Sequence, residues 1–301
     1  MQRKIAMAVL VLGAAGCLAQ SGDLSGWTKL VDKNECEKAK SLCTGFAASK
    51  DAEQQAEAQR CLGNVSLCGH SMMIVQGDKD GNGTQRGSYQ PVAIDEALKH
   101  FNAGIKLAPQ SIKLHQDRLR ILGLGARYDQ MIKALDESCT VYHGRDVPGA
   151  WMGFSSGLAD LGQFDKGLEF TKVLDKHYPD SPEVLGNIGG FLFWLKRPAE
   201  AIPYLQRATA LDPKDESNAW DLARAYDATD KVALAEKWYQ TGLSLQTDPL
   251  VAKESKCLYA MFVDAKLKDR TRACTLEKEN CDDARQKACA PPPKAQKPAA
   301  K

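Results

Sequence analysis

A short acidic stretch has the residue types and spacing of a calcium-binding loop. Asp78, Asp80 and Asn82 place oxygen ligands at alternate positions, Gly83 follows at the sharp turn, and Thr84 continues the series. Ca²⁺ is a hard cation that prefers carboxylate and carbonyl oxygens, so this spacing suits it. The candidate calcium ligands of the sequence are therefore Asp78, Asp80, Asn82 and Thr84.

The second half of the same loop departs from the calcium pattern. Tyr89 occupies the position of the closing bidentate glutamate, and Arg86 replaces a neutral or acidic ligand. Only Asp95 or Glu96, outside the loop, could complete the coordination shell. The segment 78–90 therefore reads as a solvated Gly/Asp-rich loop, with calcium binding as the weaker interpretation.

One segment matches a motif of catalytic serines. Residues 153–157 read Gly-Phe-Ser-Ser-Gly, the G-x-S-x-G pattern of hydrolase nucleophiles. That chemistry needs a strained turn from strand to helix, whereas this segment lies in a predicted helix just after Trp151. The 5 histidines have no metal-binding spacing, and no Gly-rich loop carries a phosphate-binding lysine. The sequence therefore predicts no catalytic residue, no cofactor and no enzymatic activity.

Four N-terminal cysteines have the spacing of a doubly cross-linked helical hairpin. Cys36 and Cys43 are seven residues apart, as are Cys61 and Cys68, so each pair faces one side of its own helix. An antiparallel hairpin that turns near Ala52 aligns Cys36 with Cys68 and Cys43 with Cys61, and we predict these two disulfides. A zinc site is the alternative, but zinc knuckles use closer spacing, C-x₂₋₄-C.

The C-terminal cysteines suggest a second cross-linked region. A turn near Asp269 places Cys257 opposite Cys281, which leaves Cys274 and Cys289 as partners if the chain reverses again. Four cysteines allow three connectivities, and the other two stay open. Cys139 stands alone on a predicted helix, where a buried thiol acts as a small apolar residue.

The elements that carry these residues repeat along the chain. A small residue stands twelve positions before a proline three times, at Gly167, Ala201 and Ala97, and Pro179 and Pro213 are 34 residues apart. A fixed period of this length indicates helical hairpins stacked on copies of themselves. Proline cannot continue a helix, so it marks the end of each unit.

The repeats resemble the tetratricopeptide repeat (TPR) family. The segment 148–181 carries the family's slots most completely, with Trp151, Leu158, Gly162, Phe164, Leu174 and Pro179. Segments 182–215 and 216–249 follow the same pattern, 112–147 is a weaker copy, and 91–109 supplies only a second helix. The resemblance covers roughly half the chain and implies an all-α solenoid of about four helical hairpins.

The sequence thus predicts six segments. They are a signal peptide at 1–19, a disulfide-stapled helical hairpin at 20–77, the Gly/Asp-rich loop at 78–90, the repeat array at 91–249, capping helices with the second cysteine cluster at 250–289, and a disordered Pro/Ala/Lys-rich tail at 290–301.

The resemblance also implies a binding surface. In this family the first helices of the hairpins line the concave face, where ligand peptides lie. The equivalent positions here are Lys113, Gln116, Arg120, Met152, Ser156, Asn187, Trp194, Trp220, Asp221 and Arg224. Asn187 stands where an asparagine often bonds a peptide backbone in the family, and Arg224 could hold an acidic group. The family's clamp for C-terminal carboxylates is missing, and a tryptophan at helical spacing such as Trp220 is more often a core residue than an exposed anchor.

The N-terminus indicates export. Arg3 and Lys4 precede an apolar run, and a small-residue segment ends at Ala19, which is typical of a secretory signal cleaved before Gln20. Lipoprotein processing at Cys17 is the alternative. No later stretch is apolar enough to span a bilayer. We therefore expect a periplasmic or secreted protein.

Charge restricts the partners further. A formal net charge of +2 without a basic stripe does not favour nucleic acid. The expected function is a non-catalytic, protein- or peptide-binding scaffold of the bacterial cell envelope, with a lipid-anchored assembly factor and an envelope enzyme as alternatives. The basic tail could contact anionic envelope polymer. The sequence names neither the ligand nor the oligomeric state.

Overall fold

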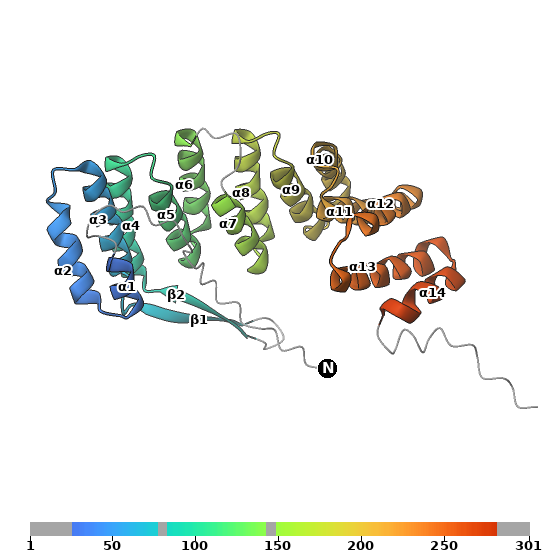
Figure 1. The fold of residues 1–301 in the computed structure, drawn as a ribbon, viewed down its shortest axis with the longest axis horizontal. Coiled ribbons are helices and arrows are strands. Elements are labelled where there is room, and N and C mark those ends of the chain that lie inside the picture. The colour runs from blue at the N-terminus through green and yellow to red at the C-terminus, as the bar shows by residue number, and fades with distance from the viewer. Residues whose placement is uncertain (1–25, 78–82, 143–148, 282–301) are drawn as a thin grey trace, which may run out of the picture. The chain divides into compact units, whose positions relative to one another are not determined.

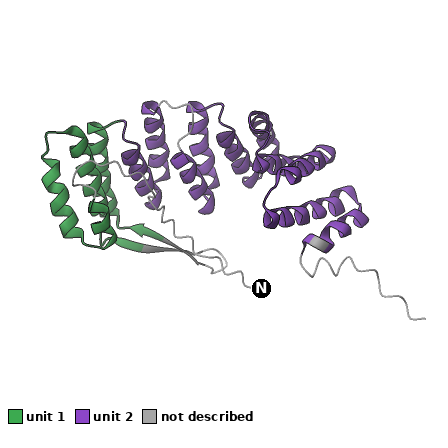
Figure 2. Ribbon diagram, in the orientation of Figure 1, with its two compact units in different colours: residues 1–109 green, residues 110–301 purple. Residues whose placement is uncertain are grey.

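The computed structural model describes residues 26–77, 83–142 and 149–281 (Figure 1). The chain divides into two compact units, Met1–Pro109 and Gln110–Lys301, called unit 1 and unit 2 below (Figure 2). The predicted signal peptide, the C-terminal tail and the calcium candidates Asp78, Asp80 and Asn82 lie outside the described residues. Cys289, the expected partner of Cys274, lies there too.

Unit 1 is built from helices and one β-hairpin. Its elements are α1 (Trp27–Asp32), α2 (Cys36–Ala47), α3 (Ala52–Val65), β1 (Ser71–Gly77), β2 (Gly83–Tyr89) and α4 (Pro91–Leu107). The turn between α2 and α3 ends at Asp51, whose carboxylate accepts hydrogen bonds from the backbone N–H groups of Glu53 and Gln54. This cap satisfies two of the free donors at the start of α3 and sets the point where the chain reverses.

Two disulfides join α2 to the α3 end of the hairpin. Cys36 is bonded to Cys68 and Cys43 to Cys61, with Cα–Cα distances of 5.9 Å and 6.1 Å. The predicted disulfide-stapled helical hairpin is therefore confirmed. The inner pair is fully buried, whereas Cys36 and Cys68 are only partly covered.

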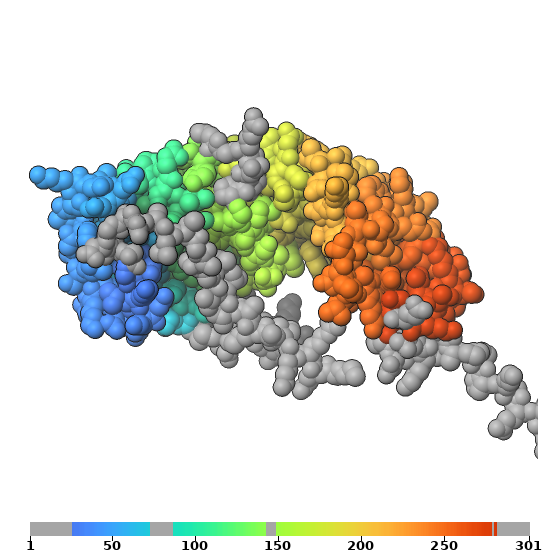
Figure 3. Space-filling view, viewed as in Figure 1, coloured from blue at the N-terminus to red at the C-terminus, as the bar shows by residue number. Residues whose placement is uncertain are grey.

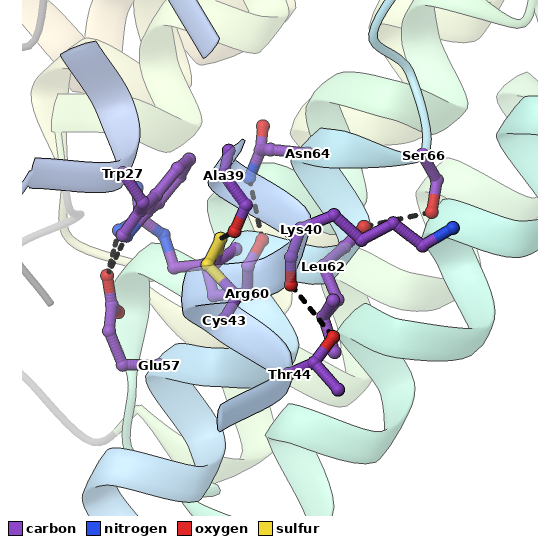
Figure 4. The surroundings of a disulfide bond; sticks show 11 residues. Trp27, Ala39, Lys40, Cys43, Thr44, Glu57, Arg60, Leu62, Asn64 and Ser66 are labelled. Atoms are coloured by element: carbon purple, nitrogen blue, oxygen red, sulfur yellow. Dashed lines mark hydrogen bonds and ion pairs between the residues drawn. A yellow bond between two sulfur atoms is a disulfide. The ribbon is translucent and has the colours of Figure 1, made fainter. Parts of the chain in front are cut away.

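A small core surrounds the inner disulfide (Figure 4). Trp27 of α1 is buried against it, and its indole Nε1 donates a hydrogen bond of 3.0 Å to Glu57 Oε1. The Arg60 guanidinium lies 5.2 Å from the centre of the Trp27 ring and also pairs with Glu57 at 2.9 Å. The tryptophan therefore keeps its polar atom satisfied while its apolar body seals the disulfide from water.

The β-hairpin was not predicted. Residues 83–89, expected to belong to a loop, form β2, which pairs antiparallel with β1 from Ser71 opposite Tyr89 to Gly77 opposite Gly83. The loop interpretation is wrong for these residues, because the predicted loop continued to residue 90 whereas the second strand already begins at Gly83. The β-branched pair Ile74 and Val75 was the strand signal that the sequence contained.

Helix α4 packs on α3. A Cβ atom at Gly63 of α3 would overlap the ring of Phe101 of α4, which is fully buried. The absence of a side chain at Gly63 therefore leaves the space that the Phe101 ring occupies. Packing thus groups α4 with the stapled hairpin in unit 1, although the repeat pattern of the sequence begins at residue 91.

Unit 2 contains four helical hairpins followed by a cap. The hairpins are α5 (Ile112–Leu124) with α6 (Tyr128–Val141), α7 (Gly149–Asp160) with α8 (Phe164–His177), α9 (Pro182–Trp194) with α10 (Pro198–Leu211), and α11 (Glu216–Ala228) with α12 (Val232–Leu245). The cap consists of α13 (Pro249–Phe262), the π-helical η2 (Val263–Leu267) and α14 (Arg270–Asn280). Cys257 of α13 is bonded to Cys281, with a Cα–Cα distance of 5.2 Å. The predicted all-α solenoid of about four repeats with a C-terminal cap is confirmed.

Small residues allow the helices of unit 2 to approach closely. A Cβ atom at Gly167 would overlap the Phe191 ring, and one at Gly189 would overlap the Leu205 side chain. The turns within the hairpins use a left-handed backbone at recurring positions, Gly162 (φ 67°), Lys196 (φ 61°) and Asp230 (φ 55°). The 34-residue period of the sequence therefore appears in both the packing and the turns.

Candidate functional site

The first helices of three consecutive hairpins share a hollow of about 290 Å³. It is lined by Met152 and Ala159 of α7; Glu183, Gly186, Asn187, Gly190, Phe191 and Trp194 of α9; and Asp215, Ser217, Asn218 and Asp221 at the start and along the length of α11. We call it the α9 hollow. Figure 3 shows the surface of unit 2 hollowed on one side between the green of α7 and the orange of α13.

The α9 hollow brings together four of the ten residues that the family resemblance indicated, Met152, Asn187, Trp194 and Asp221. The others lie elsewhere on the first helices. Trp220 and Arg224 of α11 line a neighbouring hollow. Ser156 is exposed on α7 and donates to the Met152 carbonyl. On α5, Arg120 pairs with Asp117, Lys113 is exposed and Gln116 is half-buried.

Three aromatic rings, Phe164, Phe193 and Trp194, pack together beside the α9 hollow, and Trp194 belongs to its lining; we call this group the aromatic shelf. Trp194 is 50% exposed, and its ring stacks on Phe164 of α8 with 5.7 Å between centroids and 9° between planes. Phe193 meets Trp194 edge to face at 6.3 Å. An exposed tryptophan held in one orientation offers a large apolar surface at low entropic cost, which suits a contact with a ligand.

Arg224 is already engaged within unit 2. Its guanidinium lies 4.2 Å from the centre of the Phe193 ring and 5.5 Å from that of Trp194. It also donates to Asp221 Oδ1 at 3.2 Å. Burial raises the pKa of the Asp221 carboxyl above its ordinary value, and the positive charge of Arg224 opposes that shift. Arg224 therefore positions Asp221 and the shelf rather than presenting a free cation.

Asn218 is a residue that sequence reasoning missed. Its side chain is buried, at 4% exposure, and its Oδ1 occupies the space that a side chain on Gly186 would fill. Its Nδ2 has no hydrogen-bond partner among the described residues. The sequence contained one related feature, the glycine at position 186, which leaves room for the Asn218 side chain. Gly186 is on α9 and Asn218 on α11, so only the packing of these two helices connects the positions. Glu183 was missed as well, since its exposed site on the first turn of α9 resembles ordinary solvated surface.

The neighbouring hollow, of about 320 Å³, lies between α11 and the cap. Trp220 forms its floor: the ring packs on Tyr239 with 5.1 Å between centroids, and a Cβ atom at Gly242 would lie 2.8 Å from the indole. Trp220 therefore packs against α12, in agreement with the core interpretation of this tryptophan. Leu258 and Met261 of α13 leave apolar surface exposed beside it.

Cys139 carries a free thiol in the interior of unit 2. Burial, followed by the nearby Asp136 charge, raises the pKa of this thiol to about 12. We expect Cys139 in the folded protein to resist iodoacetamide at pH 8, because the thiolate is the reactive species. Peptide mapping checks this result, with protein unfolded in denaturant without reductant as the control in which Cys139 reacts. Rapid labelling of the folded protein would contradict the burial argument.

No cluster of three or more histidine, cysteine, aspartate or glutamate side chains in the described part of the chain could hold a metal ion. No helix in the described ranges has the length and apolar character needed to cross a membrane.

A tetratricopeptide repeat family model matches residues 192–253, which contain the last turn of α9, all of α10, α11 and α12, and the start of α13. No curated protein matches the sequence. The match falls on the helical hairpins whose packing is described above.

The chain also matches several solved structures, each with a TM-score below 0.5. The Cut9–Hcn1 hetero-tetramer of the APC/C is 16% identical with a TM-score of 0.44, over 87% of this chain and 47% of that chain, so this chain spans about half of its length. Pseudomonas aeruginosa pilF is 14% identical with a TM-score of 0.42, over 62% and 83%. YrrB, a TPR protein with an unusual peptide-binding site, is 13% identical with a TM-score of 0.43, over 62% and 96%. Residues 192–253 of this chain therefore match the tetratricopeptide repeat family, and they lie within the helical hairpins of unit 2 and the start of its cap.

Proposed function

We propose that this protein is a non-catalytic scaffold that binds an extended peptide segment of a partner protein in the α9 hollow. The observation that carries the proposal is the exposed, oriented ring of Trp194 beside a hollow whose lining includes Asn218, a residue with a buried, unpaired amide donor. Tetratricopeptide repeats are solenoids whose concave surfaces serve protein and peptide binding. An apolar anchor with a few convergent polar groups is the composition expected of such a site.

The proposal includes export to the bacterial cell envelope. Cysteine pairs persist in oxidising compartments, and α2, α3 and α13 carry three of them. The charged and apolar N-terminal residues support cleavage of a signal peptide before Gln20. Intact mass of the mature protein tests this step, because a lipid on Cys17 would place the protein on a membrane surface instead.

Replacing the aromatic anchor tests the binding site. Peptides are first selected from a random displayed library with the purified wild-type protein. Trp194→Ala should weaken their binding by about tenfold or more, because truncation of a central aromatic anchor commonly costs about 2 kcal/mol. Asn187→Ala should weaken binding less, since it removes one polar contact.

Leu234→Ala is the matched control. Leu234 is also exposed, at 43%, but it lies on α12, a second helix. Circular dichroism should show unchanged helicity for every variant. Failure to select any peptide, or equal binding by wild type and Trp194→Ala, would rule out the α9 hollow as the peptide site.

A further inference from the structure

The charged side chains that line the α9 hollow are all acidic. Glu183, Asp215 and Asp221 are carboxylates, and no lysine, arginine or histidine belongs to the lining. Arg224, outside the lining, packs on Phe193 and is bonded to Asp221 Oδ1. It balances one of the three carboxylates, so the hollow keeps a negative excess.

The three carboxylates are not equivalent. Asp215 caps the start of α11, where its Oδ1 accepts from the Asn218 backbone N–H, and Glu183 lies in the first turn of α9. Both are stabilised by the positive ends of their helices. Asp221 lies in the middle of α11, away from the helix ends, and Arg224 contacts only its Oδ1, so Oδ2 can still gain from an external cation.

The geometry of Asp221 leaves one oxygen directed to the hollow. Oδ1 accepts from Arg224, whereas Oδ2 lies 3.7 Å from the point that a Cβ atom on Gly190 would occupy and accepts no hydrogen bond from the described residues. Gly190 lines the hollow, so the missing side chain opens the approach to Oδ2. A cationic group that enters between α9 and α11 can reach this oxygen.

A second, independent feature points to a ligand in the same place. Asn218 Nδ2 is a buried donor without a partner in a residue that lines the hollow. A buried unpaired donor is costly. The atom is covered in the free protein, so a ligand carbonyl oxygen would satisfy it once the Asn218 amide turns toward the hollow. A peptide that carries a basic side chain supplies both groups, because its backbone carbonyl can accept from Asn218 while its side chain pairs with Asp221.

We propose that the α9 hollow selects a lysine or arginine side chain of its peptide ligand, with Asp221 and Glu183 as counter-charges, Trp194 as an aromatic wall and Asn218 as a donor to the ligand backbone. Aromatic faces attract such cations, so Trp194 contributes to the same selection. This inference rests on the proposed peptide-binding function and adds the sign of the charge that the ligand carries.

The test compares three peptide libraries. Each consists of random dodecapeptides with blocked ends and a fixed central residue, which is lysine, glutamine or glutamate. The full mature protein should retain the lysine library at least about tenfold better than the glutamate library at low ionic strength, and the preference should shrink as salt is added. The double variant Asp221→Asn/Glu183→Gln should lose most of this preference.

Glu169→Gln/Asp129→Asn is the charge-matched control. Glu169 on α8 and Asp129 on α6 lie outside the hollow lining, and both pair with Lys166. This variant should keep the lysine preference. A preference that survives in the Asp221→Asn/Glu183→Gln double variant would show general attraction to an acidic surface and overturn the site. Equal or better retention of the glutamine or glutamate library would overturn the charge selection while leaving peptide binding in place. Retention of no library by the wild type would overturn the peptide-binding function as well.

Discussion

Removal of both N-terminal disulfides is expected to unfold the α2–α3 hairpin while unit 2 stays folded. The variant replaces Cys36, Cys43, Cys61 and Cys68 by serine. Each disulfide of this kind contributes about 2–4 kcal/mol, mainly by restricting the unfolded chain, and the loops that close here span 32 and 18 residues. The core of the hairpin is small and is built around the inner pair, so little else compensates.

Hydrogen exchange followed by mass spectrometry measures this effect separately in each unit. The slowest amides of α2 and α3 should exchange about a thousandfold faster or more, since loss of both disulfides removes about 4 kcal/mol or more, whereas those of α9 to α12 should not change. Cys257→Ser/Cys281→Ser is the matched control, because it removes a disulfide of the cap and should affect α13 and α14 only. Wild-type exchange rates in α2 and α3 of the quadruple variant would show that the hairpin is stable without its cross-links.

The same substitution at two adjacent glycines is expected to have opposite effects. Gly189→Ala should lower the stability of unit 2 by about 1–3 kcal/mol, because the new Cβ atom would overlap the buried Leu205 side chain. Gly190→Ala should raise stability by about 0.5–1 kcal/mol, since alanine restricts the unfolded chain and favours the helix. The Cβ atom at this position meets only Asp221 Oδ2, at an ordinary contact distance of 3.7 Å.

Urea unfolding followed by circular dichroism compares the two variants. The denaturation midpoints should fall on opposite sides of the wild-type value, and the difference depends on the partner across the helix interface rather than on α9 itself. A loss of stability in both variants would mean that Gly190 is held in place by a contact other than Asp221.

The periodic part of the fold was predictable because it repeats. A small residue stands twelve positions before a proline at three places, so a weak signal became strong through repetition. The disulfide pairs were accessible for a similar reason, since two cysteines spaced by two turns on each helix fit one hairpin geometry. The β-hairpin had no such support: it occurs once, and its β-branched pair is short.

The chemistry of the candidate site was less accessible to sequence reasoning. Position on a first helix identified four lining residues, Met152, Asn187, Trp194 and Asp221. It could not show which side chains of neighbouring helices contact or hydrogen-bond one another. Arg224 suggested an acidic ligand until the structure placed it on Phe193 and Asp221. The unpaired donor of Asn218 arises from packing against Gly186 on another helix, and no spacing along one segment contains that relation.

The positions of the cross-links bear on how this solenoid resists proteases. Terminal repeats have a neighbour on one side only, so fraying and proteolytic nicking normally start there. Here the covalent bonds lie near the beginning and the end of the described chain, between Cys36 and Cys68 and between Cys257 and Cys281, while the hairpins from α5 to α12 have none. Digestion should therefore begin inside the array under oxidising conditions and shift to the ends once a reductant opens them, which makes the lifetime of the protein dependent on the redox state of its surroundings.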